Sequence, residues 1–230
     1  MSNSKKLSET RTGQIISNDE SVSQEKRVRT AVKKVYNYLK RTYPDITFQL
    51  ESSVNKFELG KKLNNIHPKL GTFTSSRKSG FRPDGGFLYA WFDGKKKLIL
   101  SVEAKKQGTN DIRMASGEDQ QAKGNAIERS PKTYGEVVIM QLNEEIFPYL
   151  IFVSGCDFAK GSTITDRITG MNYQSDINEL YIQKLRVKLD WGETLLPRAS
   201  LFVRKRQWGT QSIYNACLEA VEISIAHHSK

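Results

Sequence analysis

RPDGGFLYAWFDGKKKLILSVEAK, which runs from Arg82 to Lys105, is the stretch of sequence that decides the fold. Residues 87–92 form an unbroken apolar and aromatic run, and Asp93-Gly94 is typical of a tight turn between two strands. Residues 97–105 then have the pattern of a return strand. The stretch therefore predicts a buried β-hairpin.

Two acids and a lysine come together at one end of this hairpin. Asp84 precedes the first strand, and side chains alternate along the return strand, so Glu103 and Lys105 point the same way. The opposite face is predicted to be core and carries a continuous apolar set: Leu98, Leu100, Val102 and Ala104. Two hard carboxylates suit Mg²⁺, and an ammonium beside them suits a water or a phosphate oxygen. Taken alone, the same residues also fit a turn followed by a surface ion pair.

The composition is that of a soluble protein with room for a sizeable core. The chain has 230 residues, 37% hydrophobic and 27% charged. No apolar run is long enough to span a bilayer, and the polar N-terminus lacks the apolar core of a secretory signal. Cys156 and Cys217 have no metal-ligand spacing. We therefore expect reduced thiols in a cytoplasmic protein.

The net charge of +11, from 36 Lys and Arg against 25 Asp and Glu, favours a polyanionic partner. Nucleic acid is the first candidate. No basic helix combines a broad apolar face with flanking Trp, so we expect no membrane partner. The alternative is a basic protein with an unrelated partner.

The N-terminal part of the chain predicts an arm and two helices. Residues 1–20 are rich in Ser, Asn, Thr and charge, which predicts a mobile arm. Ser21-x-x-Gln24 resembles a capping box, and the helix after it is predicted to end near Tyr43-Pro44. This helix carries an apolar stripe: Val28, Ala31, Val32, Val35 and Leu39. A second helix is predicted over residues 53–66.

Later segments alternate between helix and strand patterns. Helices are predicted over residues 125–145, 175–189 and 211–227, and the last has one apolar face: Ile213, Cys217, Val221 and Ile225. Residues 149–153 form a continuous apolar run typical of a buried central strand, and residues 199–204 also predict a strand. Strands separated by helices indicate an α/β fold with helices on the faces of a sheet. No linker divides residues 21–230, so we predict one domain there.

A second motif, GNAIERS, occupies residues 124–130. Asn125 can donate and accept together at the N6/N7 edge of adenine, and Arg129 can grip a purine acceptor or a phosphate. Glu128 could hold that guanidinium or accept from a base amine, while Gly124 and Ala126 are small enough to let the backbone approach a base edge. The alternative interpretation is a helix cap followed by a solvated Glu-Arg pair.

Together these motifs resemble the EcoRI-like type II restriction endonucleases of the PD-(D/E)xK superfamily. The matching strings occur in the family's order, PDGG at 83–86, EAKKQG at 103–108 and GNAIERS at 124–130. FPYL at 147–150 also matches just before the apolar strand. The similarity runs from about Val32 to Thr165. A PD…ExK pattern alone is common, whereas the three strings in one chain are highly specific.

The resemblance implies a mixed-sheet α/β core in one catalytic and DNA-binding domain. It implies a homodimer around duplex DNA and Mg²⁺-dependent hydrolysis of one phosphodiester per strand at a palindrome. Asp84 and Glu103 would ligate the metal with the carbonyl of Ala104, and Lys105 would orient the attacking water or neutralise developing charge. One and two metal ions are both compatible with these residues.

The resemblance also assigns the second motif. Residues Gly124, Asn125, Ala126, Glu128 and Arg129 would read adenines in the major groove, which implies an AATT core cut with 5′ overhangs. The protein would be prokaryotic and would share a restriction system with a DNA methyltransferase, without forming a stable complex with it.

The chain departs from the family around the second motif. The segment between Gly108 and Gly124 is shorter, and Gln121 and Lys123 replace apolar and small residues that lie near the outer base pair in the family. The predicted helix at 176–183 lacks the family's arginine pair for outer contacts. We therefore predict a degenerate or different outer pair, such as purine-AATT-pyrimidine.

Two other classes of function stay open at this point. One is a PD-(D/E)xK nuclease of another role, such as a repair or junction-resolving enzyme that cuts by DNA shape. The other is a catalytically silent DNA-binding module in which the acids form a structural ion pair. A defined ladder of fragments would exclude the first, and metal-independent binding without nicking would favour the second.

Overall fold

A computed structural model describes residues 19–66, 68, 79–106, 116–117, 130–142, 144–155, 175–177, 180–182, 184–189 and 192–230. The helices are α2 (Asp19–Thr42), α3 (Lys56–Ile66), α6 (Ser130–Met140) and α8 (Thr210–His228). The first strands are β1 (Phe48–Glu51), β2 (Val54–Asn55), β3 (Gly80–Phe81), β4 (Phe87–Phe92) and β5 (Lys95–Lys106). The later strands are β6 (Tyr149–Ser154), β7 (Ser175–Ile177), β8 (Lys184–Leu189), β9 (Gly192–Pro197) and β10 (Ala199–Arg204).

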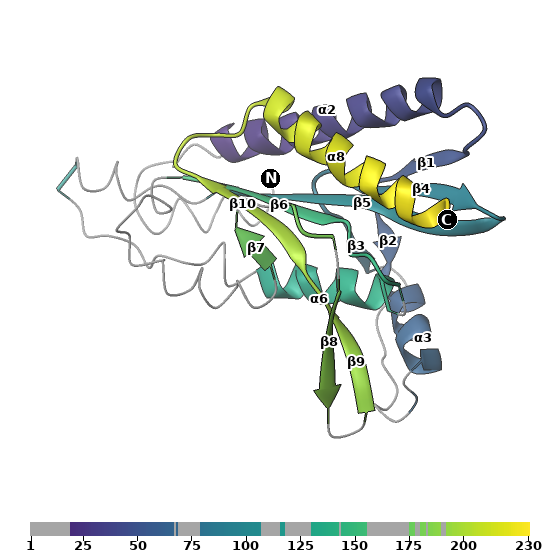
Figure 1. Ribbon diagram of the computed structural model, residues 1–230. Coiled ribbons are helices and arrows are strands. Elements are labelled where there is room, and N and C mark those ends of the chain that lie inside the picture. The colour runs from purple at the N-terminus through teal and green to yellow at the C-terminus, as the bar shows by residue number, and fades with distance from the viewer. Residues whose placement is uncertain are drawn as a thin grey trace.

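The main sheet is mixed and has the strand order β1-β4-β5-β6-β10-β7. β1, β4 and β5 pair antiparallel, whereas β5, β6, β10 and β7 pair parallel. In Figure 1, α2 and α8 lie on one face of this sheet and α6 lies on the other. The predicted α/β architecture, a mixed sheet with helices on both faces, is confirmed.

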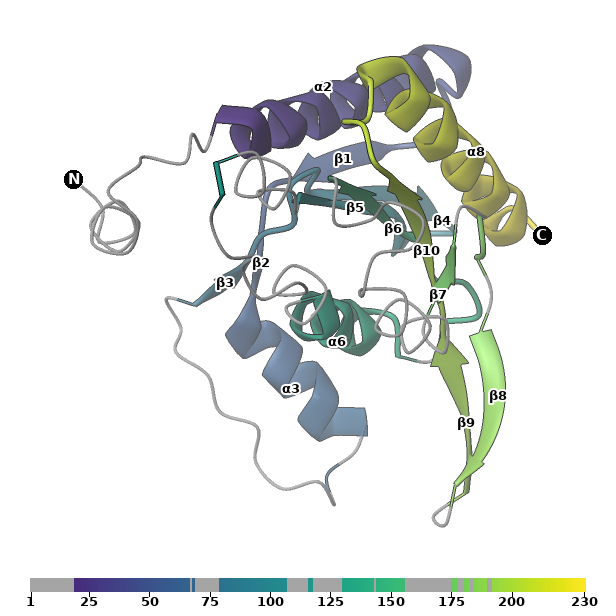
Figure 2. The same cartoon turned by 90° about the vertical axis from the view of Figure 1, so that its left-hand side faces the viewer.

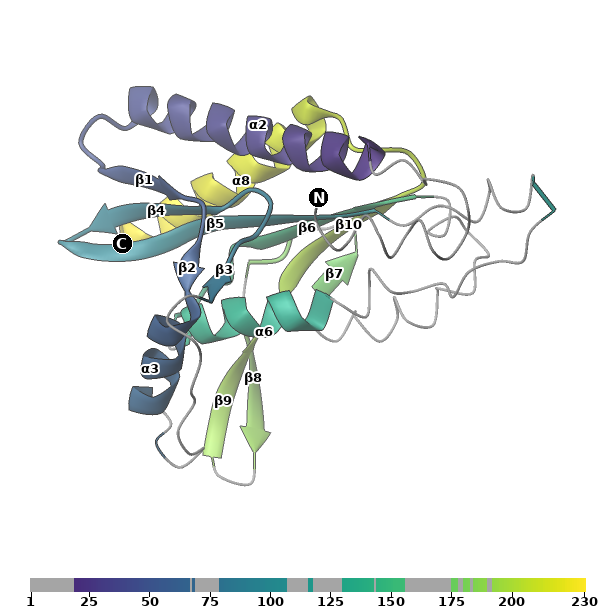
Figure 3. The ribbon, with the colours of Figure 1, turned by 180° about the vertical axis from the view of Figure 1, so that it is seen from behind.

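Each face of the sheet buries its own apolar core. The first core packs the stripes of α2 and α8 against β4, β5 and β6, and includes the whole predicted stripe of α2. The second core lies under α6 and α3 and takes its residues of the main sheet from β4, β5, β6 and β10. Figure 2 shows α6 and α3 across the sheet from α2, and Figure 3 shows α2 over the side formed by β1, β4 and β5. Because β6 contacts both cores, all six of its residues are buried, as the apolar run predicted.

The hairpin forms where the sequence predicts it. Phe92 pairs with Lys95, so Asp93 and Gly94 are the two turn residues. Both have positive φ, 49° at Asp93 and 72° at Gly94. A tight turn of this kind needs positive φ at both positions, which is why Asp-Gly suits it.

The predicted facing of one hairpin residue is wrong. Leu88 pairs with Leu100 and Tyr89 pairs with Leu98, so Ile99 is an extra residue that forms a β-bulge. An extra residue reverses the alternation of side chains. Leu98 therefore packs into the core under α6, while Leu100, Val102 and Ala104 face α2 and α8.

Three helix boundaries differ from the prediction. α2 begins at Asp19, so the predicted arm is two residues too long, and Ser21 lies inside the helix and does not cap it. α3 begins at Lys56 because Val54 and Asn55 pair with β3, and the Asn55 Oδ1 accepts a hydrogen bond from the Phe57 amide at 2.9 Å.

α6 spans Ser130–Met140, so it ends before residue 145, the predicted end of this helix. Its second residue, Pro131, is tolerated because the first amides of a helix need no partner within it.

The predicted helix over residues 175–189 is wrong. β7 pairs with β10 and extends the main sheet, and β8 pairs with β9 in a separate hairpin. Figure 1 shows that this hairpin projects away from the main sheet. The apolar residues of this segment have helical spacing, but its backbone hydrogen-bonds to β9 and β10, which lie later in the chain, and therefore forms strands. The strand prediction at 199–204 and the C-terminal helix with its apolar face are confirmed.

Candidate active site

The turn that carries Asp84 is attached directly to the return strand of the hairpin. The Gly86 amide donates to the Pro83 carbonyl at 3.0 Å, which closes the turn before β4 begins. The Gly85 amide donates to the Val102 carbonyl at 2.9 Å. This second bond fixes Asp84 beside the end of β5, where Glu103 and Lys105 lie.

The two glycines of the PDGG string are needed for packing and backbone conformation. A Cβ on Gly85 would lie 2.8 Å from the Val102 Cβ and 3.0 Å from the Val32 Cγ2 of α2. Gly86 has φ of +72°, and a Cβ there would clash with the Glu51 carbonyl oxygen of β1. Both positions therefore require glycine, because a side chain at Gly85 would push the turn away from β5 and α2, and one at Gly86 would push it away from β1.

The structure brings Asp84, Glu103 and Lys105 together. The Asp84 Oδ2 accepts a hydrogen bond from the Ala104 amide at 2.8 Å. The Asp84 amide donates to the Glu103 Oε2 at 3.2 Å. The Lys105 Nζ donates to the other oxygen of Glu103, as expected for two side chains on one face of a strand. Their proximity agrees with the sequence analysis, and their catalytic roles stay a prediction.

Burial and mutual repulsion make the two carboxylates costly to ionise without a cation. Glu103 is only 6% exposed. Burial, with the nearby charge of Asp84, raises the pKa of Glu103 to about 6, and Lys105 offsets part of this rise. Burial also raises the pKa of Asp84, and the Ala104 amide and Lys105 oppose the rise. A cation between the two carboxylates would relieve both effects.

The donor set fits a hard divalent cation that keeps part of its water shell. Val102 and Ala104 both form main-chain hydrogen bonds toward the Asp84 turn, through the Val102 carbonyl and the Ala104 amide. Because the amide and carbonyl of one strand residue leave on the same side, the Ala104 carbonyl also points there. Among the described residues no three His, Cys, Asp or Glu side chains cluster as ligands. Two carboxylates and a carbonyl, completed by water, are the kind of set that Mg²⁺ accepts.

α2 contributes a charged pair to this site that the sequence analysis did not identify. Burial and the charge of Asp84 raise the pKa of Glu25, while Arg29 and Lys105 oppose this. The Arg29 Nη2 lies 3.0 Å from the Glu25 Oε2, and the charge of Arg29 opposes part of the rise in the pKa of Asp84. An acid and an arginine four residues apart occur on many exposed helices, so the sequence carried no signal of their location.

The second motif lies outside the described residues. Gly124, Asn125, Ala126, Glu128 and Arg129 all belong to this part of the chain, and the structure describes the backbone again from Ser130, where α6 begins. Their assignment to DNA reading stays a prediction.

A mixed sheet covered on both faces, with two acids and a lysine at the end of its central hairpin, is the core of a PD-(D/E)xK restriction endonuclease. The sequence profile of the family described as restriction endonuclease EcoRI matches residues 10–165, and the chain belongs to this family. It is therefore a type II site-specific deoxyribonuclease.

Two named relatives align over most of the chain. The type II restriction enzyme EcoRI of Escherichia coli is 30% identical over 225 residues, which cover 84% of this chain and 81% of that enzyme. The type II restriction enzyme RsrI of Cereibacter sphaeroides is 27% identical over 227 residues, with 86% and 82% covered. The similarity is thus more extensive than the stretch from Val32 to Thr165. In the part of the chain that the structure describes, no helix has the length and apolar character to cross a membrane.

Proposed function

We propose that this enzyme cuts both strands of duplex DNA at a palindrome with an AATT core, and that it requires Mg²⁺. The outer pair would be purine and pyrimidine, and the products would carry 5′ overhangs. The observation that carries the proposal is the pair of half-buried Asp84 and buried Glu103, which are linked through main-chain amides, with Lys105 in contact with Glu103. Membership of the EcoRI family makes a palindromic DNA site the natural substrate.

In this proposal each site residue has a distinct role. Asp84, Glu103 and the Ala104 carbonyl would hold the metal, which when bound supplies charge stabilisation at the scissile phosphate. Lys105, held by Glu103, would orient the attacking water or neutralise charge that develops on the phosphate oxygens. The turn glycines keep Asp84 at the end of β5. A shift of about 1 Å in such a group is enough to slow a reaction strongly.

DNA reading would belong to the GNAIERS segment. Support comes from residue chemistry, because Asn125 can form two hydrogen bonds with adenine and Arg129 can grip a purine edge or a phosphate. A homodimer would present two copies of this segment to the two halves of the palindrome. A methyltransferase of the same restriction system would protect host DNA without forming a stable complex with this enzyme.

The test is digestion of a sequenced plasmid with purified enzyme and Mg²⁺, followed by run-off sequencing of the ends. Asp84→Ala should abolish cutting and keep sequence-specific duplex binding. Glu58→Ala is the matched control, because Glu58 lies on α3 with its side chain 61% exposed and pairs only with neighbouring Lys61 in the described structure. It should cut like the unmodified enzyme.

The pattern of ends separates the competing interpretations. Discrete cuts at AATT-centred sites, absent with Asp84→Ala, support the proposal. A smear, or cuts that follow DNA junctions, would indicate a shape-directed nuclease. Binding without nicking at any Mg²⁺ concentration would indicate a silent DNA-binding module. Cleavage of GAATTC alone, with AAATTT untouched, would refute the degenerate outer pair.

A further inference from the structure

Three parallel strands, β5, β6 and β10, have their C-terminal ends at the same end of the sheet, and this end carries the candidate active site. Lys106 of β5 is in register with Ser154 of β6, and Ser154 is in register with Arg204 of β10. Neighbouring strands are about 4.8 Å apart, so Arg204 begins about 10 Å across the sheet from the catalytic strand. Lys106 follows Lys105 directly, so Arg204 lies one residue farther along the strands than Lys105. A basic residue of β10 therefore lies at the same end of the sheet as the candidate active site, with its side chain on the face covered by α2 and α8, whereas Glu103 and Lys105 lie on the face covered by α6.

The Arg204 guanidinium is fixed in place by the loop that follows β10. Its Nε donates to the Arg206 carbonyl at 3.0 Å, its Nη2 donates to the Gln207 carbonyl, and it stacks 4.0 Å from the centre of the Trp208 ring. The Trp208 ring is itself anchored, because its Nε1 donates to the Val153 carbonyl at 2.9 Å. An arginine held in this way loses little conformational freedom when it binds a ligand.

A second guanidinium converges on the same loop from α2. The Arg27 Nη1 donates to the Trp208 carbonyl at 3.2 Å. The Trp208 amide donates to the Gln24 Oε1 at 3.0 Å, which ties the loop to the same helix. Burial and the charge of Arg27 lower the pKa of Arg204. Two cations thus face each other across one loop.

No acid in the described structure neutralises this pair. Neither Arg27 nor Arg204 has a carboxylate within ion-pair distance among the residues that the structure describes. Their hydrogen bonds to described residues go to main-chain carbonyls, which carry no net charge. Two guanidinium groups that lie close together without an acid suit a phosphate, because they donate charge-assisted hydrogen bonds to its oxygens. Arg206, which is exposed, adds a further positive charge to the same loop.

We propose that Arg27 and Arg204 form a binding site for a phosphate of the DNA backbone, at the same end of the sheet as the candidate catalytic carboxylates and on the face covered by α2 and α8. The inference rests on the proposed function, because the ligand is the same duplex that the active site cuts. Phosphates of one strand follow each other every 3.4 Å or so along the helix axis. Because Arg204 is about 10 Å or more from the catalytic strand, the phosphate held here would lie about three or more nucleotides from the scissile bond, and its contact would hold the duplex in register without reading sequence.

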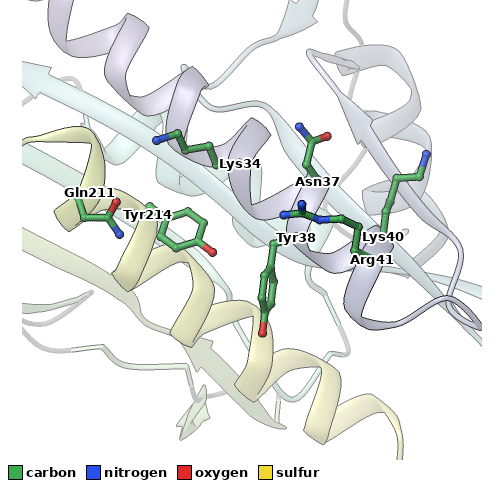
Figure 4. A pocket seen from close by; sticks show the side chains of 7 residues that line it. All are labelled: Lys34, Asn37, Tyr38, Lys40, Arg41, Gln211 and Tyr214. Carbon is green, nitrogen blue, oxygen red and sulfur yellow. The ribbon is translucent and has the colours of Figure 1, made fainter.

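The chain offers a matched control on the same helix. A groove of about 690 Å³ between α2 and α8 is lined by Lys34, Lys40 and Arg41, and Figure 4 shows these side chains with Gln211 and Tyr214 of α8. Arg41 is 14 residues after Arg27, or about 21 Å along the helix. It therefore tests whether loss of any positive charge from α2 weakens DNA binding.

The experiment measures duplex affinity without metal as a function of salt concentration, with one duplex that contains the AATT site and one that lacks it. Arg27→Gln and Arg204→Gln should each reduce the slope of log affinity against log salt by about 0.9. At 0.1 M salt this corresponds to about eightfold weaker binding to both duplexes. Arg41→Gln should leave the slope unchanged. Urea unfolding of each variant establishes that it is folded, and Arg204→Lys, which keeps the charge, should retain most of the slope.

A duplex with one neutral methylphosphonate at successive positions identifies the phosphate. One position about three or more nucleotides from the cut should weaken binding of the unmodified enzyme and leave binding of Arg204→Gln unaffected. The inference is overturned if the slope of folded Arg27→Gln and Arg204→Gln equals that of the unmodified enzyme, or if Arg41→Gln lowers it equally. If the unmodified enzyme binds both duplexes with equal affinity, the proposed sequence specificity fails, whereas the phosphate site is still tested by the slopes.

Discussion

Replacing Glu103 by glutamine should make the metal-free enzyme more stable at pH 8, although it removes a proposed metal ligand. The pKa of Glu103 rises from an ordinary 4.5 to about 6, first because of burial and then because of Asp84. At about 1.4 kcal/mol per pH unit, the ionised carboxylate costs the folded state about 2 kcal/mol. Glutamine keeps the shape of the side chain and an acceptor for the Asp84 amide, but it carries no charge.

The gain should depend on pH in a defined direction. The folded protein binds the Glu103 proton more tightly than the unfolded chain does, so the stability from this group is fully present below pH 4.5. It is lost as the pH rises through about 6. The free energy of unfolding of Glu103→Gln should therefore exceed that of the unmodified enzyme by about 2 kcal/mol at pH 8, and the difference should shrink toward pH 4.5.

The assay is urea unfolding with a chelator at pH 5 and pH 8, with Glu58→Gln as an exposed control. The experiment is then repeated with Mg²⁺. A ligand that binds only the folded state stabilises it by about 2.7 kcal/mol at a hundred times its Kd, so saturating Mg²⁺ should reverse the order of the two proteins. A Glu103→Gln enzyme that is less stable at pH 8 without metal, or a difference that is equal at both pH values, would refute the reasoning.

Two further predictions concern the turn and the second motif. Gly85→Ala should destabilise the fold by about 1–3 kcal/mol and slow cleavage, because its Cβ would lie 2.8 Å from the Val102 Cβ. Gly135→Ala in α6 is its control, since nothing lies within 4 Å of that Cβ, and urea unfolding should show a gain of up to about 1 kcal/mol. Arg129→Ala should weaken specific binding by about 1–3 kcal/mol and blur one base position, as measured on a panel of single-base variants of the site. An equal loss on every sequence would mean that Arg129 contacts a phosphate.

The sequence determined those parts of the molecule whose pattern is local. The Asp93-Gly94 turn, the apolar stripe of α2 and the buried run of β6 each follow from a periodicity within a few residues. The PDGG, EAKKQG and GNAIERS strings, in this order, indicate the family from the sequence alone. Glu103 and Lys105 were placed on one face of a strand because side chains alternate over a short distance, and their contact agrees with this.

Tertiary structure decided the features that depend on partners far away in the chain. The bulge at Ile99 arises from pairing with β4, and residues 175–177 became a strand because β10 was available beside them. Glu25 and Arg27 look like ordinary charges on an exposed helix, yet the packing of α2 sets one near Asp84 and the other beside Trp208. Periodicity reports which face of an element is buried, whereas the neighbours of that element depend on contacts between segments up to 184 residues apart. For this reason the sequence indicated the candidate catalytic acids, and only the folded chain could reveal that Arg27 and Arg204 contact the same loop.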